Sequence, residues 1–115
     1  MTLDARALLA IVRREPGFER VLEAVADDEN PRVPAPALAE AAIILSAGGE
    51  LMPTVLLDIV VDRLRLTVVP FTKEHWKGAA KAYEKGRKLG ERPVFGRCLS
   101  EAVASAVGAP IVSAD

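Results

Sequence analysis

The sequence predicts an α/β fold in which helices cover both faces of a short, mainly parallel sheet. Short apolar or β-branched runs alternate along the chain with longer stretches in which apolar residues recur at helical spacing. Proline and glycine stand at the ends of most of these stretches. The chain has 115 residues, enough for one domain with a substantial core, so we expect a single domain over residues 1–115.

The first half of the chain predicts two short strands and four helices. The run "RVPAP" is rich in proline, so a strand there can be only two or three residues long. Proline opens each of the next two helices, and a glycine pair follows the first of them. The expected elements are a strand at 2–3, helices at 5–14 and 17–27, a strand within 32–36, and helices at 36–47 and 53–64.

The second half predicts a β-branched strand, two helices and a final short strand. Thr72 is the expected N-cap of a long helix whose first turn is 73–75 and which runs to about residue 89. The segment "RKLGERP" reads as a loop. The remaining expected elements are a strand within 65–71, a helix at 96–107 and a strand within 109–115.

Composition excludes several classes of function. The net charge is −1, so any contact with nucleic acid must come from a local patch and not from an overall basic field. Cys98 is the only cysteine and His75 the only histidine, which excludes an internal disulfide, a cysteine-based zinc site and most histidine-based sites. The first residues form no signal peptide, and no run approaches a membrane span. We therefore expect a cytoplasmic protein.

Three acidic residues stand where the predicted strands end. Asp4 ends the first strand, Asp115 ends the last, and Glu40 lies in the first turn or so of the helix after "RVPAP". Parallel sheets bind ligands at the carboxyl edge of their strands, and several carboxylates there favour a hard divalent cation such as Mg²⁺. The alternative is that each acid is only a helix cap or dipole partner, in an unrelated small α/β domain.

The ordered blocks "LDARALLAIVRREPGFERVLEAV", "PAPALAEAAIIL", "VVPFTKEH", "AAKAYEKGRK" and "FGRCLSEAVASAVGAPIVSAD" resemble those of PIN-domain proteins. The likeness is to the toxins of bacterial VapBC toxin–antitoxin pairs. It implies a three-layer α/β/α sandwich, a homodimer, a VapB-like antitoxin as partner, and an endoribonuclease that uses Mg²⁺ (or Mn²⁺) to cleave RNA. In that family four acids hold the metal; Asp4, Glu40 and Asp115 match the first, second and fourth, and are the expected catalytic ligands.

Two arginines depart from the family pattern. Arg97 stands where the family has its third acid, and Arg6 where it usually has a serine or threonine. A fixed positive charge should weaken metal binding. If both arginines pair with the acids instead, the chain would be a catalytically inactive PIN-fold module that retains dimerisation and antitoxin or RNA binding. Relatives also continue past the position of Asp115, which leaves open whether the last strand of the sheet is missing.

Two further groups of charged residues have alternative interpretations. Glu101 lies four residues after Arg97 and can either add a metal ligand or pair with Arg97 on one helix face; the pair is favoured. Lys85, Arg87 and Lys88 can contact RNA phosphates, or they can simply complement the dipole at a helix end.

Overall fold

The computed structural model describes residues 1–112 and confirms the expected alternation of short strands and helices. In chain order the elements are β1 (Thr2–Leu3), α1 (Ala5–Arg13), α2 (Phe18–Ala26), β2 (Arg32–Pro34), α3 (Ala35–Ala47), α4 (Pro53–Arg63), β3 (Thr67–Val69), α5 (Trp76–Lys88), α6 (Phe95–Val107) and β4 (Ile111–Val112).

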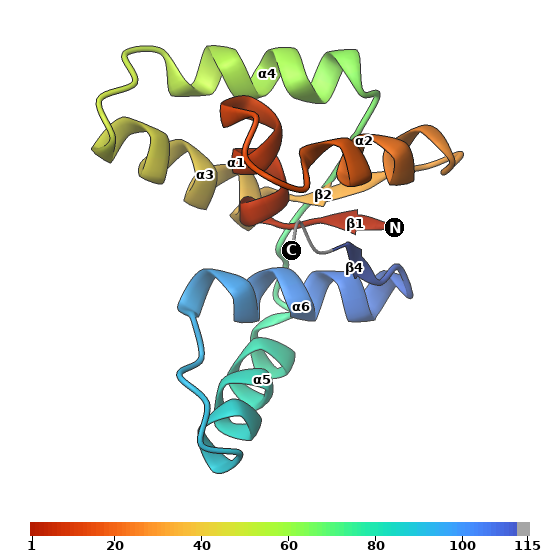
Figure 1. The fold of residues 1–115 in the computed structure, drawn as a ribbon. Helices are drawn as coiled ribbons and strands as arrows, with labels where there is room; N and C mark the ends of the chain where they lie inside the picture. The colour runs from red at the N-terminus through yellow and green to blue at the C-terminus, as the bar shows by residue number, and fades with distance from the viewer. Residues whose placement is uncertain (113–115) are drawn as a thin grey trace.

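The four strands form one sheet in the order β3-β2-β1-β4, and every pairing is parallel. Thr2 of β1 is in register with Arg32 of β2 on one side and with Ile111 of β4 on the other. Helices α1 to α4 lie on one side of the sheet and α5 and α6 on the other (Figure 1). The predicted three-layer α/β/α sandwich is therefore confirmed.

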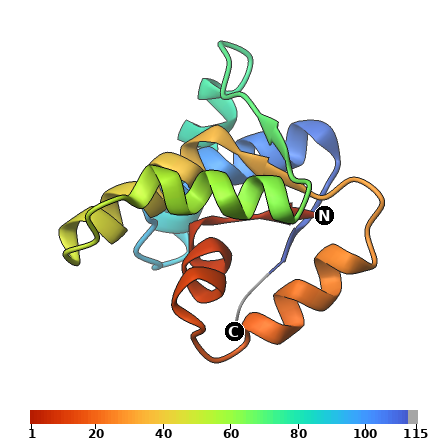
Figure 2. The ribbon, with the colours of Figure 1, turned by 90° about the horizontal axis from the view of Figure 1, so that it is seen from above.

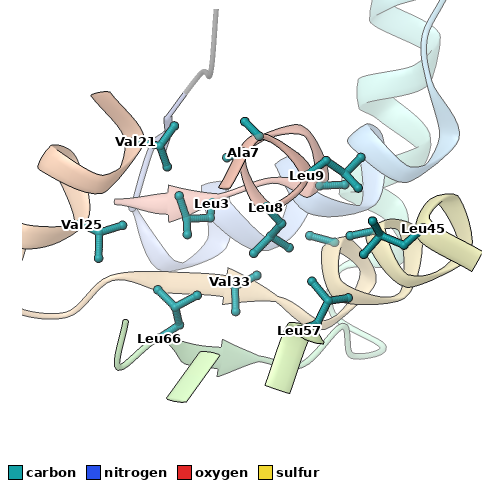
Figure 3. Close-up of a cluster of buried hydrophobic side chains, with 14 residues drawn as sticks. Leu3, Ala7, Leu8, Leu9, Val21, Val25, Val33, Leu45, Leu57 and Leu66 are labelled. Carbon is teal, nitrogen blue, oxygen red and sulfur yellow. The ribbon is translucent and has the colours of Figure 1, made fainter. Parts of the chain in front are cut away.

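The main hydrophobic core lies between the sheet and the helices α1 to α4. Leu3 and Val33 extend from the two central strands, and Leu8 of α1 packs with them; all three are fully buried (Figure 3). Leu57 of α4 and Leu66, just before β3, also belong to this cluster and lie on the Val33 side of it. Figure 2 shows α4 crossing the sheet from above. This core fixes the strand ends that carry the acidic residues.

The second face of the sheet is covered more thinly. Cys98 and Val103 of α6 are buried there, so the lone thiol is a core residue. Helix α5 packs on the outer side of α6 (Figure 1). A Cβ built on Gly78 of α5 would lie 3.5 Å from the Ala102 Cβ, so small residues allow the two helices to approach closely.

The predicted start of α5 is wrong by one turn. The helix begins at Trp76, and residues 72–75 form a turn in which the His75 amide donates to the Thr72 carbonyl (2.9 Å). The Thr72 hydroxyl bonds to the Glu74 carboxylate (2.8 Å) and the His75 Nδ1 accepts from the Thr72 amide (2.9 Å). These local side-chain bonds compete with helix formation, so Thr72 is not the N-cap.

No helix in residues 1–112 is both long enough and apolar enough to cross a membrane.

Candidate active site

Asp4 lies between β1 and α1 and its side chain is buried. It is the N-cap of α1: Oδ1 accepts a hydrogen bond from the Ala7 amide at 2.9 Å. One oxygen of Asp4 therefore acts as a helix cap, which was the alternative role expected for an acid at a strand end. The other oxygen, Oδ2, faces a different partner across the carboxyl edge of the sheet.

That partner is Arg97. Its Nη1 donates to Asp4 Oδ2 at 2.7 Å, and its Nε donates to Glu101 Oε1 at 3.1 Å. The Arg97 side chain is 42% exposed, whereas that of Asp4 is 5% exposed. The guanidinium therefore bridges a buried carboxylate and a surface one. The favoured i,i+4 pair of Glu101 with Arg97 is confirmed.

Glu40 is the second carboxylate of the site. It lies in the second turn of α3, slightly deeper in the helix than the sequence predicted. Its pKa is raised above the ordinary value, first by burial and then by the negative charge of Asp4, while the positive charge of Arg97 opposes the shift. The three charged groups are thus close enough to influence one another.

The N-terminus of α6 obtains its anion from another helix. The N-cap Val94 offers no side-chain hydrogen bond, and the first turn of α6 contains no acidic residue. The Glu40 carboxylate instead packs against Gly96, where an added Cβ would collide with it. A carboxylate at this end complements the helix dipole. Arg97 is accommodated because its guanidinium reaches away to Asp4 and Glu101.

The structure thus brings together Asp4, Glu40, Arg97 and Glu101. Asp115 lies outside the described residues 1–112. Arg6 is exposed in the first turn of α1. The remaining predicted contacts are exposed in the last turn of α5: Lys85, Arg87 and Lys88.

Sequence reasoning missed a cavity of about 530 Å³ on the seam between α5 and α6. We call it the aromatic hollow, after four of its lining residues: Phe71, Trp76, Tyr83 and Phe95. The seven-residue spacing of the second and third of these, two helical turns, was a signal that they share one face of α5.

The side chains gathered at this site are of the type that binds divalent cations. Carboxylate oxygens are the ligands that Mg²⁺ and Mn²⁺ prefer, and Asp4 and Glu40 supply them at one place. Within residues 1–112, however, no group of three or more acidic, histidine or cysteine side chains is arranged to hold a metal. Arg97 also engages the Asp4 oxygen that a cation would use. A cation at this site would have to compete with the guanidinium.

Comparison with known proteins decides the family. The sequence model of the PIN domain matches residues 1–115. The chain belongs to the PIN domain family. It is 30% identical over 117 aligned residues to a VapC ribonuclease of Mycobacterium bovis and equally to ribonuclease VapC36 of Mycobacterium tuberculosis. Each alignment covers 98% of this chain and 84% of the relative.

Two solved structures share the fold. The crystal structure of VapBC2 from Rickettsia felis, bound to a DNA fragment from their promoter, superposes with a TM-score of 0.76 at 18% identity, covering 97% of this chain and 84% of that one. Mycobacterium tuberculosis VapC20, a sarcin–ricin loop cleaving toxin, gives a TM-score of 0.73 at 15% identity, covering 94% and 83%. The PIN fold inferred from the sequence is confirmed.

Proposed function

We propose that this PIN-domain chain is a VapC-like endoribonuclease that depends on Mg²⁺ or Mn²⁺ and whose activity is lowered by Arg97. Its curated relatives are named ribonucleases. One observation carries the proposed reduction in activity. The Arg97 guanidinium lies 2.7 Å from Asp4 Oδ2, on the carboxylate that would hold the metal.

Asp4, Glu40 and Asp115 are the proposed metal ligands. When bound, the cation would supply an activated water and neutralise charge that develops on the phosphodiester. The chain's own contribution is to gather the carboxylates. The raised pKa of Glu40, to which the charge of Asp4 contributes, indicates that the two carboxylates repel each other and would gain from a shared cation.

Arg97 acts against metal binding in two ways. It neutralises Asp4 and thereby reduces the attraction for a cation, and its own charge repels one. Glu101 gives the guanidinium a second partner at 3.1 Å. Arg97 can therefore release Asp4 and remain paired, which makes the loss of activity partial in this proposal.

The other elements of the proposal concern partners. Lys85, Arg87 and Lys88, exposed at the end of α5, would contact RNA phosphates. The fold similarity to a VapBC pair supports a VapB-like antitoxin as partner. We also propose that the chain works as a homodimer, as a single unit over residues 1–115, and in the cytoplasm, where RNA and antitoxin meet.

A second candidate follows from the same ion pair. If Arg97 replaces the metal outright, the chain is a catalytically inactive PIN module that retains dimerisation and antitoxin or RNA binding. The observation in its favour is that Asp4 already has both oxygens satisfied, one by the Ala7 amide and one by Arg97.

The experiment compares cleavage of a structured RNA by the native protein and by Arg97→Asp, each with Mg²⁺ and with a chelator. Arg63→Asp is the matched control, since it makes the same charge change at the exposed end of α4. Binding of Mn²⁺ to each protein by calorimetry provides a readout that does not depend on activity.

Weak cleavage by the native protein that Arg97→Asp enhances, and that the chelator abolishes, is the expected result. Cleavage by Arg97→Asp alone would establish the inactive module. Cleavage that persists in the chelator would refute the metal dependence. If neither protein cleaves RNA or binds Mn²⁺, the metal-dependent ribonuclease is refuted and only the inactive module remains.

A further inference from the structure

We propose that the aromatic hollow binds an unpaired nucleobase of an RNA strand whose backbone passes beside Asp4 and Glu40. This inference rests on the proposed function, because it takes RNA as the ligand. It adds a base-binding subsite formed by the residues that line the seam between α5 and α6.

The hollow gathers four of the five aromatic residues of the chain. Three of them are exposed residues: Trp76 is 57% exposed, Tyr83 42% and Phe95 76%. They come from α5 and from the start of α6, while Phe71 belongs to the loop between β3 and α5. Large aromatic side chains that only stabilise a core are buried. Exposed aromatic side chains gathered around one cavity are instead typical of a binding surface.

The hollow lies next to the candidate active site. Phe95 immediately precedes Gly96, whose backbone packs against the Glu40 carboxylate. Phe71 follows the carboxyl end of β3, and Asp4 follows the carboxyl end of β1 in the same parallel sheet. Parallel sheets bind ligands at this edge. A strand of RNA that places a phosphate near Asp4 and Glu40 can therefore place a neighbouring base in the hollow.

The charge around the hollow fits a nucleic acid. Lys77 Nζ lies 5.5 Å from the centre of the Trp76 ring. Lys77, Lys81, Lys85 and Lys88 recur every three or four residues and so share one exposed face of α5. Of these lysines, Lys77 borders the hollow, whereas Lys81 and Lys85 line a separate cavity between α5 and α6. Proteins that bind single strands combine a basic track for the backbone with aromatic rings for the bases.

Lysine is depleted in protein–protein interfaces, so Lys77 beside the Trp76 ring favours a nucleic acid over a protein partner. Glu84 also lines the hollow, and its carboxylate can accept a hydrogen bond from the exocyclic amino group of a base. The hollow thus offers rings for stacking and an acceptor for a base edge, with the Lys77 ammonium beside it.

Trp76 allows a direct test because it is the only tryptophan of the chain. Its fluorescence would be followed while a short single-stranded oligoribonucleotide is added in a chelator at fixed salt, so that no metal-dependent cleavage occurs. A second oligomer of the same length, with abasic riboses in place of nucleosides, supplies the phosphates without the bases. The variants are Phe95→Ala and Tyr83→Ala. Leu51→Ala, which removes a side chain that is 93% exposed and far along the chain from the hollow, is the control.

The expected result is quenching by the normal oligomer and much weaker binding of the abasic one. Phe95→Ala should weaken binding of the normal oligomer by roughly ten-fold, as the loss of one stacked base predicts. Leu51→Ala should bind as the native protein does. These binding results do not depend on whether the protein cleaves RNA.

Equal affinity for both oligomers, or no effect of Phe95→Ala, would overturn the subsite even if the cleavage experiment succeeds. Sedimentation of the same variants measures their self-association and so tests whether the hollow is a contact between protein chains. If Phe95→Ala disrupts self-association and leaves RNA affinity unchanged, the hollow is a contact between protein chains and the inference is wrong.

Discussion

The Glu40 carboxylate lies against Gly96 so closely that a side chain on Gly96 would overlap it. Two residues from different helices thus share one small volume at the carboxyl edge of the sheet. The contact places an acid at the start of α6 and confines that acid beside Asp4 and Arg97. Several consequences of this arrangement can be measured.

Gly96→Ala should displace the Glu40 carboxylate without unfolding the protein. Alanine is a better helix former than glycine by up to about 1 kcal/mol. At Gly96 this gain in stability should be cancelled, because the new Cβ pushes the Glu40 carboxylate away from the start of α6. Gly78→Ala is the matched control, because its Cβ would meet Ala102 only at an ordinary distance of 3.5 Å. Urea denaturation should show Gly78→Ala stabilised and Gly96→Ala not. Equal stabilisation of the two variants would mean that Glu40 does not occupy the site in solution.

The Asp4–Arg97 pair should contribute to folding by a measurable coupling. A double-mutant cycle with Asp4→Asn and Arg97→Ala isolates it, since asparagine can still cap α1. Asp4 is buried but Arg97 is nearly half exposed. We therefore expect a coupling energy of about 1 kcal/mol, a value between those of exposed and of buried ion pairs. The measurement is the free energy of unfolding of all four proteins. A coupling within error of zero would show that Arg97 is turned to solvent.

Glu40 should make stability fall as the pH rises. Its pKa is raised in the folded state, first by burial and then by Asp4, so the protonated form is favoured by folding. That contribution is present below the unfolded pKa and is lost as the pH rises through the raised folded pKa. Glu40→Gln removes the ionisation and should therefore gain stability relative to the native protein between about pH 4 and about pH 7.

Denaturation curves at the two pH values check this prediction, with Glu29→Gln, an exposed loop residue, as control. Asp28 acts in the opposite direction. Hydrogen bonds from the N-terminal ammonium and from the Asn30 amide lower its pKa, so its contribution is lost as the pH falls. Because Asp28 is present in all three proteins, differences between them report on Glu40. An unchanged difference between native protein and Glu40→Gln across the range would contradict the raised pKa.

Ser100→Ala should be neutral or stabilising. Ser100 is 1% exposed, and within residues 1–112 its Oγ has no hydrogen-bond partner. Removing a buried hydroxyl that lacks a partner should gain about 1 kcal/mol, to which the higher helix propensity of alanine adds. Ser105 is exposed on the same helix, so Ser105→Ala measures the contribution of helix propensity alone. A loss of stability in Ser100→Ala would reveal a partner for this hydroxyl in solution.

Local pattern in the sequence determined most of the fold. Proline at the start and glycine after the end identified α3, and apolar spacing identified α1 and α6, because these signals act within a few residues. The alternation of strands and helices predicted the parallel sheet, and strand ends predicted Asp4 and Glu40 at one edge. The start of α5 was missed, since bonds among Thr72, Glu74 and His75 favour a turn over a helix there.

The tertiary structure decided which charges meet. Arg97 and Asp4 are 93 residues apart in the chain, so their ion pair depends on how α6 is placed relative to α1. The close packing of Glu40 on Gly96 and the gathering of Phe71, Trp76, Tyr83 and Phe95 around one hollow also depend on how α3, α5 and α6 pack. Such contacts form between segments distant in sequence, so neither propensity nor spacing encodes them. Helix and strand follow from neighbours along the chain, whereas the chemistry of the site follows from neighbours in space.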